Sequence, residues 1–173
     1  MSVLVIAEIQ HQTLSSGTFS TLTAAKELLN DIEVLLVGHN CQAIAQSLSK
    51  FEGVKKVLVV DNPAYEHVLA ETISPIVVEI SNAYTHILTA SDTFGKNFMP
   101  RVAALKDVML ISDVTKIIDE KTFVRPIYAG NAFATVESSD SMKLLLIRAT
   151  AFDKAQEAAN NAPIEALALN FKE

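Results

Sequence analysis

The run Ser91-Asp92-Thr93-Phe94-Gly95-Lys96 holds the residues best placed for ligand chemistry. It follows a predicted strand, residues 86–90, and begins a predicted helix. Open α/β sheets bind ligands at such junctions, where free backbone N–H groups and the helix dipole attract anions. Ser, Asp and Thr are also the usual helix caps, and the Asp92 carboxylate would repel an anion. We therefore favour helix capping over anion binding, with Gly95 permitting a turn.

The single cysteine and the histidines are the other candidates for chemistry. Cys41 is expected at the start of a helix, where a thiol pKa can fall, but a catalytic cysteine also needs a base and no such constellation is visible. We interpret it as a small first-turn residue. The four histidines lack the i, i+4 spacing of a helical metal pair: His11, His39, His67 and His86. No spacing between acidic residues singles out a pair for general acid/base catalysis. We predict no catalytic residue and no metal site.

Glycine-rich phosphate loops are missing from the sequence. Neither G-x-G-x-x-G nor G-x-x-x-x-G-K-[ST] occurs. The five glycines are far apart: Gly17, Gly38, Gly53, Gly95 and Gly130. No glycine loop can therefore wrap a pyrophosphate, which argues strongly against tight dinucleotide binding by the usual route. We predict no cofactor-binding residue in this chain.

Arg125 is unusual because it lies in an otherwise apolar predicted strand, beside Pro126. The proline places this segment at a sheet edge or a bulge. An arginine there can form a planar ion pair across an interface. It can equally be an exposed edge charge that discourages strand pairing. The residues alone leave both interpretations open.

Composition excludes several classes of protein. The chain has 173 residues, is 50% apolar and carries a net charge of −6. Its size suits one domain with a proper core, and its acidic balance argues against nucleic-acid binding. No apolar run approaches the roughly 20 residues that span a bilayer, and no basic segment indicates a signal or transit peptide. With one cysteine and a strand right after Met1, we expect a bacterial chain that is used as translated, in the cytoplasm, without membrane insertion.

The first half of the sequence alternates buried strands with helices. Continuous β-branched runs predict strands at residues 3–7, 33–37, 56–60 and 86–90. Apolar stripes predict helices within 19–29, capped by Ser16 or Thr18, and within 44–51. This alternation predicts a parallel sheet with helical crossovers.

Prolines set the expected helix boundaries in the next segment. Pro75 suits a first helical position with Ser74 as cap, so we predict two short helices, 65–71 and 75–83. Pro100 is expected near the first turn of a helix over 96–105, where its missing N–H costs little.

The second half leaves no room for helices between its strands. Apolar runs predict strands at residues 108–111, 114–118, 122–127, 132–136 and 142–147. Their hairpin-length connections predict an antiparallel arrangement that extends the parallel sheet or lies against its edge. Residues 152–161 indicate a connector before a last strand, 164–169. We therefore expect one α/β domain over residues 1–173.

Six segments follow one another in order through nearly the whole chain: Ser2-Val3-Leu4-Val5-Ile6-Ala7-Glu8, Asn40-Cys41-Gln42-Ala43-Ile44-Ala45, Thr93-Phe94-Gly95-Lys96-Asn97, Pro100-Arg101-Val102-Ala103-Ala104, Ile111-Ser112-Asp113-Val114 and Thr122-Phe123-Val124-Arg125-Pro126-Ile127-Tyr128-Ala129-Gly130-Asn131-Ala132. Together they are similar to the alpha subunit of electron-transfer flavoprotein, and the last segment is the most specific. The resemblance implies a Rossmann-like three-layer sandwich of the adenine-nucleotide-binding type.

The resemblance also implies a function. Family members pair with a beta subunit, take electrons from acyl-CoA and other dehydrogenases on one FAD per heterodimer, and pass them to a quinone oxidoreductase. The chain would then be part of an electron carrier rather than an enzyme. Contacts with the other subunit or domain are expected at four residues: Arg101, Arg125, Tyr128 and Asn131.

In the family, the FAD-binding half begins where this sequence stops. The resemblance therefore implies the N-terminal domain alone, with the C-terminal FAD domain missing, and a scaffolding role that holds no cofactor. One alternative is a stand-alone adenine-nucleotide-binding module that uses residues 91–96. Another is a small hydrolase that uses Cys41, which the lack of a partner base disfavours.

Overall fold

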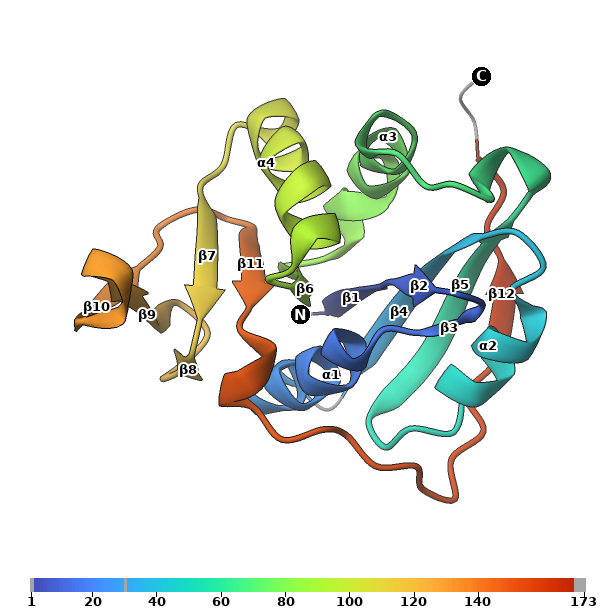
Figure 1. The fold of residues 1–173 in the computed structure, drawn as a ribbon, viewed down its shortest axis with the longest axis horizontal. Helices are drawn as coiled ribbons and strands as arrows, with labels where there is room; N and C mark the ends of the chain where they lie inside the picture. The colour runs from blue at the N-terminus through green and yellow to red at the C-terminus, as the bar shows by residue number, and fades with distance from the viewer. Residues whose placement is uncertain (1, 30, 170–173) are drawn as a thin grey trace.

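The computed structural model describes residues 2–29 and 31–169. Seven parallel strands form a central sheet in the order β12-β5-β4-β1-β6-β11-β7. Their bounds are β1 Val3–Ala7, β4 Ile32–Gly38, β5 Val54–Asp61, β6 His86–Ala90, β7 Leu110–Val114, β11 Lys143–Ile147 and β12 Ile164–Ala166. Helices α1 (Ser16–Leu28) and α2 (Gln42–Leu48) cover one face, and α3 (Ala70–Ile80) and α4 (Thr93–Lys106) cover the other (Figure 1). The predicted three-layer α/β sandwich is confirmed.

Strand residues alternate between two apolar cores. In β1, Val3 and Val5 pack on the α1–α2 side, whereas Leu4 and Ile6 pack on the α3–α4 side. All five residues of β1, β6 and β11 are buried. Burial on both faces explains why these strands are continuous apolar runs in the sequence.

The last third of the chain is only partly antiparallel. β8 (Lys116–Ile117), β9 (Thr122–Ile127) and β10 (Ala132–Glu137) form an antiparallel sheet, which we call the small sheet. It forms the connection between β7 and β11, which are parallel neighbours in the central sheet. The antiparallel prediction is therefore wrong for β7 and β11. A three-stranded insertion serves here as the crossover that a helix usually provides.

Both proline predictions are wrong in their boundaries. Pro75 lies inside α3 and Pro100 inside α4, and only the 3₁₀ turn η1 (Pro63–Tyr65) precedes α3. The carbonyls that lose a donor belong to the exposed residues Glu71 and Lys96, where water can reach them. Ser74 is a buried helix residue whose hydroxyl donates to the Ala70 carbonyl at 2.6 Å, not a cap.

Smaller differences concern the ends of elements. α1 begins after Ser15 and has no side-chain cap, so neither Ser16 nor Thr18 caps it. The predicted polar loop contains a hairpin of β2 (Ile9–Gln10) and β3 (Thr13–Leu14). Residues 152–161 form a connector without a helix, as predicted, and the last strand is shorter than predicted and runs parallel to β5. Further 3₁₀ turns are η2 (Ser81–Ala83), η3 (Tyr128–Gly130) and η4 (Ala149–Ala151).

Candidate functional site

The carboxyl ends of β1 and β6 mark the place where α/β folds usually bind ligands. β4 and β5 lie to one side of β1, and β6 and β11 lie to the other, so the strand order reverses there. After β1 the chain enters the β2–β3 hairpin, whose turn residues His11 and Gln12 have left-handed φ values of 49° and 61°. A hairpin therefore stands where nucleotide-binding folds carry a glycine loop.

Two carboxylates lie beside this crevice. Burial raises the pKa of Glu8, and the nearby charge of Asp92 raises it further. Asp92 Oδ1 also accepts a hydrogen bond from the Gly95 N–H at 2.9 Å, which confirms that this residue caps α4. Acidic groups here repel phosphate, so the described residues do not fit the pyrophosphate of FAD or another dinucleotide.

Glycines at this edge serve helix packing. A Cβ on Gly95 would lie 2.1 Å from the Ala90 carbonyl oxygen, and one on Gly17 would lie 2.7 Å from the Ala90 Cβ. Gly95 has ordinary helical geometry, so it is needed for close packing of α4 on β6. The prediction that it permits a turn is wrong.

A cavity of about 540 Å³ opens beside the crevice, between the β2–β3 hairpin and the loop after β5. Its lining includes the three histidines His11, His39 and His67, together with Tyr65 and Phe94. Within residues 2–29 and 31–169, no group of three or more histidine, cysteine or acidic side chains is arranged to hold a metal ion.

Cys41 does not have the environment of a nucleophile. It is fully buried at the start of α2, as predicted for a first-turn residue. Burial and the Asp61 carboxylate raise the pKa of its thiol to about 11. A thiol in this state is inert, which removes the observation that favoured a Cys41 hydrolase.

The run 91–96 takes part in a polar cluster within the chain. The Ser91 hydroxyl donates to Asp113 Oδ1 at 2.6 Å, and Lys96 Nζ lies 3.5 Å from the same oxygen. Burial alone would raise the pKa of Asp113, but the Ser91 hydrogen bond and the Lys96 charge lower it below its ordinary value. These contacts connect the ends of β6 and β7. The side chains of Ser91 and Lys96 therefore already have a partner, Asp113, within the chain.

Arg125 is the most constrained of the predicted contact residues. It is half-buried on β9, and its Nε donates to the Ser112 carbonyl and its Nη2 to the Ser112 hydroxyl, both at 2.9 Å. Ser112 lies on β7, the last strand of the central sheet. Arg125 therefore satisfies an edge carbonyl within its own chain, which neither interpretation from the sequence anticipated.

Tyr128 and Asn131 lie together at the turn between β9 and β10. Both are exposed, Tyr128 by 80%, and the Asn131 N–H donates to the Tyr128 carbonyl at 3.1 Å. Phe133, on the next strand, is 65% exposed. Arg101 is separate from this group, because it lies on α4, where its guanidinium is 3.8 Å from the Glu71 carboxylate.

Four large apolar residues on and beside the small sheet are exposed. Tyr128 and Phe133 are at the β9–β10 turn and on β10, whereas Ile118 and Met109, 52% and 71% exposed, come just after β8 and just before β7. We missed Phe133 from the sequence, although the alternation of β10 contains the signal: residues 133, 135 and 137 are exposed and their neighbours half-buried. Of these, Tyr128 and Phe133 are both aromatic and lie five residues apart at one end of the small sheet, and exposed apolar patches are typical of protein interaction surfaces.

A family model described as "Electron transfer flavoprotein domain" matches residues 3–171. The chain belongs to the electron transfer flavoprotein family. Its relatives are alpha subunits: it is 47% identical over 165 residues to that of Pseudomonas aeruginosa, covering 95% of this chain and 53% of the relative. It is 48% identical over 169 residues to the mitochondrial alpha subunit of Dictyostelium discoideum, covering 93% and 48%.

The chain thus spans about half the length of the curated alpha subunits it matches. The predicted family is confirmed, and these relatives are named as alpha subunits. None of the helices in the described residues has the length and apolar character that crossing a bilayer requires.

Proposed function

We propose that this chain is a scaffold domain of an electron-transfer flavoprotein and that its small sheet packs against the beta subunit. The observation that carries the proposal is the exposure of two aromatic residues at one end of the small sheet, Tyr128 and Phe133. Exposed aromatic side chains on a sheet that is anchored at several points are typical anchors of a protein interface. Of the four expected contact residues, Arg101, Tyr128 and Asn131 are exposed, and of these only Tyr128 and Asn131 lie at the small sheet. Arg125 joins β9 of the small sheet to Ser112 of β7.

The cofactor of the whole protein is proposed to lie outside this chain, which serves as an electron-carrier subunit without catalytic residues of its own. FAD, when bound in the heterodimer, accepts and releases electrons one or two at a time. The carboxylates of Glu8 and Asp92 support placing its pyrophosphate elsewhere. The electron donors are acyl-CoA and other dehydrogenases, the acceptor is a quinone oxidoreductase, and the location is the cytoplasm.

Titration calorimetry with the beta subunit tests the interface. Tyr128→Ala should weaken association at least tenfold, because buried aromatic anchors contribute about 2 kcal/mol or more. Leu69→Ala is a matched control, since Leu69 is an apolar residue that is 57% exposed just before α3, away from the small sheet. Failure of the unmodified chain to associate, or equal losses in the two variants, would contradict the proposal.

A stand-alone adenine-nucleotide-binding module is the second candidate. The cavity of about 540 Å³ supports it, because its lining includes the half-buried aromatic residue Phe94, and aromatic rings stack on bases. Calorimetry with AMP and ATP separates the two proposals: saturable heat supports the module, and its absence supports the scaffold.

A further inference from the structure

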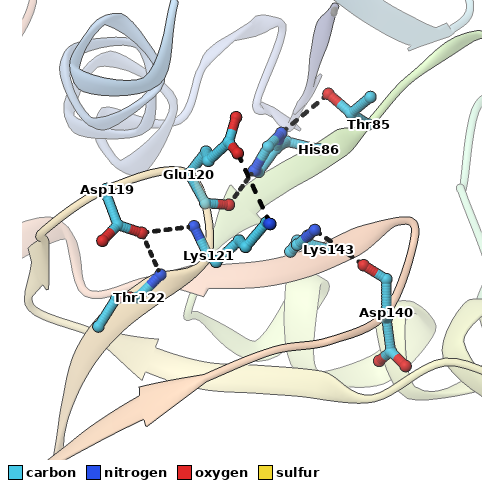
Figure 2. A network of polar contacts seen from close by, with 8 residues as sticks. All are labelled: Thr85, His86, Asp119, Glu120, Lys121, Thr122, Asp140 and Lys143. Atoms are coloured by element: carbon cyan, nitrogen blue, oxygen red, sulfur yellow. Dashed lines mark hydrogen bonds and ion pairs between the residues drawn. The ribbon is translucent and has the colours of Figure 1, made fainter.

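His86, the first residue of β6, links the central sheet to the small sheet. Its ring is 2% exposed, and Nε2 lies 2.8 Å from the Glu120 carbonyl oxygen (Figure 2). Because a carbonyl only accepts, Nε2 carries a proton. Nδ1 lies 3.0 Å from the oxygen of the Thr85 hydroxyl, which also donates to the Ser2 carbonyl at 3.2 Å. Both ring nitrogens therefore lie within hydrogen-bond distance of a polar group of the chain.

The turn that covers His86 is well ordered by its own hydrogen bonds. Asp119 Oδ1 accepts from the Lys121 and Thr122 N–H groups at 2.8 and 2.9 Å, and the Ile118 N–H donates to the Thr122 carbonyl at 2.9 Å. This turn joins β8 to β9, so residues 118–121 hold the Glu120 carbonyl over the ring. Opening the turn would expose the ring to water.

A second basic group lies beside the ring. Lys143 pairs with His86 in register on the neighbouring strand β11, is 7% exposed, and donates from Nζ to the Asp140 carbonyl at 2.8 Å (Figure 2). The Asp140 carboxylate accepts from the Met109 N–H instead. A protonated His86 would thus place two buried cations side by side.

The other charges near the ring are on exposed side chains. The Glu120 carboxylate favours protonation, but it is exposed and lies 4.0 Å from Lys121 Nζ. Burial is the main reason that the pKa of His86 is below its ordinary value of 6.5, and the charge of Lys143 lowers it further, while the hydrogen bond to Glu120 opposes them.

We propose that His86 is a pH-sensitive latch that holds the β8–β9 turn, and with it the small sheet, against the central sheet. The closed turn favours a neutral ring, because it buries His86 beside the buried Lys143. In the opened turn the ring is exposed to water, where it binds a proton with an ordinary pKa. Acidification therefore favours opening. The contribution of the latch is complete above the ordinary histidine pKa of 6.5 and is lost as the pH falls below it.

The pH dependence of opening is limited, because opening of the turn is linked to the binding of a single proton by His86. An opened state with an ordinary histidine pKa gains at most about tenfold in relative population between pH 7.5 and 5.5. Tyr128 and Asn131 lie at the turn between β9 and β10 of this small sheet, so beta-subunit binding should weaken over the same range. This last step rests on the proposed function.

Amide hydrogen exchange of this chain, corrected for the intrinsic rate at each pH, tests the latch. The Ile118 and Ser138 N–H groups report on the small sheet, since they donate to the Thr122 and Lys121 carbonyls. Their protection should fall several-fold, and at most about tenfold, from pH 7.5 to 5.5. His86→Gln keeps a donor for Glu120 and an acceptor for Thr85 without titrating, and should remove this fall.

His67→Gln is the matched control, because His67 is an exposed histidine that lies outside the small sheet, and it should keep the full response. Equal responses in the unmodified chain and His86→Gln would overturn the latch. If His86→Gln does not fold, NMR titration of the ring decides: a pKa of 6.5 or above for His86 overturns it. Calorimetry with the beta subunit separates the two proposals. If the chain binds the beta subunit at no pH, the proposed function is contradicted. If it binds equally well at pH 7.5 and 5.5, only the proposed pH dependence of binding is contradicted.

Discussion

Replacement of Arg125 separates a role inside the chain from a role at the subunit interface. Arg125→Met keeps the aliphatic part of the side chain but removes both donors to Ser112. The Ser112 carbonyl is half-buried at the edge of β7 and would lose this partner. An acceptor left without its donor in such a place costs about 1–3 kcal/mol.

We therefore expect Arg125→Met to lower the free energy of unfolding by about 2 kcal/mol, within the range for a lost partner. For a chain of this size that corresponds to a fall of roughly 4–8 °C in Tm. Arg101→Met is the matched control. Its guanidinium is exposed and 3.8 Å from the Glu71 carboxylate, so its loss should cost less than about 0.5 kcal/mol.

Urea unfolding followed by circular dichroism measures both variants, with calorimetry against the beta subunit as a second readout. The reasoning is refuted if the two variants lose equal stability. It is also refuted if Arg125→Met unfolds like the unmodified chain but binds the beta subunit more weakly, because Arg125 would then act at the interface and not on Ser112.

Three further predictions concern packing and reactivity. Gly95→Ala should lower the free energy of unfolding, measured with urea, by about 3 kcal/mol, because the new Cβ would lie 2.1 Å from the Ala90 carbonyl oxygen. A loss below about 0.5 kcal/mol would show that α4 can move away from β6 and would contradict the expectation. Phe123→Ala should lower the free energy of unfolding by about 3–5 kcal/mol, because the fully buried ring packs the small sheet against the core. A variant as stable as the unmodified chain would contradict this role. Iodoacetamide should alkylate Cys41 at pH 7.5 about 100-fold more slowly than a free thiol, since its pKa of about 11 leaves far less thiolate; rates within a few-fold of glutathione would contradict its burial.

The alternation of strands and helices was predictable because burial on both sheet faces leaves a strong local signal. β1 and β6 have the predicted bounds for that reason. The direction of β11, which runs parallel to β6 and β7, could not be predicted from local signals. The short connections that make β8, β9 and β10 antiparallel do not determine how the next strand pairs. Connection length predicts the pairing of immediate neighbours only.

Proline positions misled the helix boundaries because tertiary packing outweighed a local rule. The apolar stripe of Ile73, Ile76 and Val77 continues across Pro75 and is fully buried, which stabilises one helix in place of two. The partners of Arg125 and His86 were equally hidden, since Ser112 and Glu120 are 13 and 34 residues away in the sequence. The expected contact residues Tyr128 and Asn131 came from a family resemblance, and the structure adds the exposed Phe133 on the next strand.

Hydrogen-exchange mass spectrometry of this chain, with and without the beta subunit, tests the central claim most directly. We expect added protection in residues 128–137, where η3 and β10 carry Tyr128 and Phe133. Protection confined to α3 and α4, with residues 128–137 unchanged, would contradict the claim that the small sheet is the surface on which the partner binds.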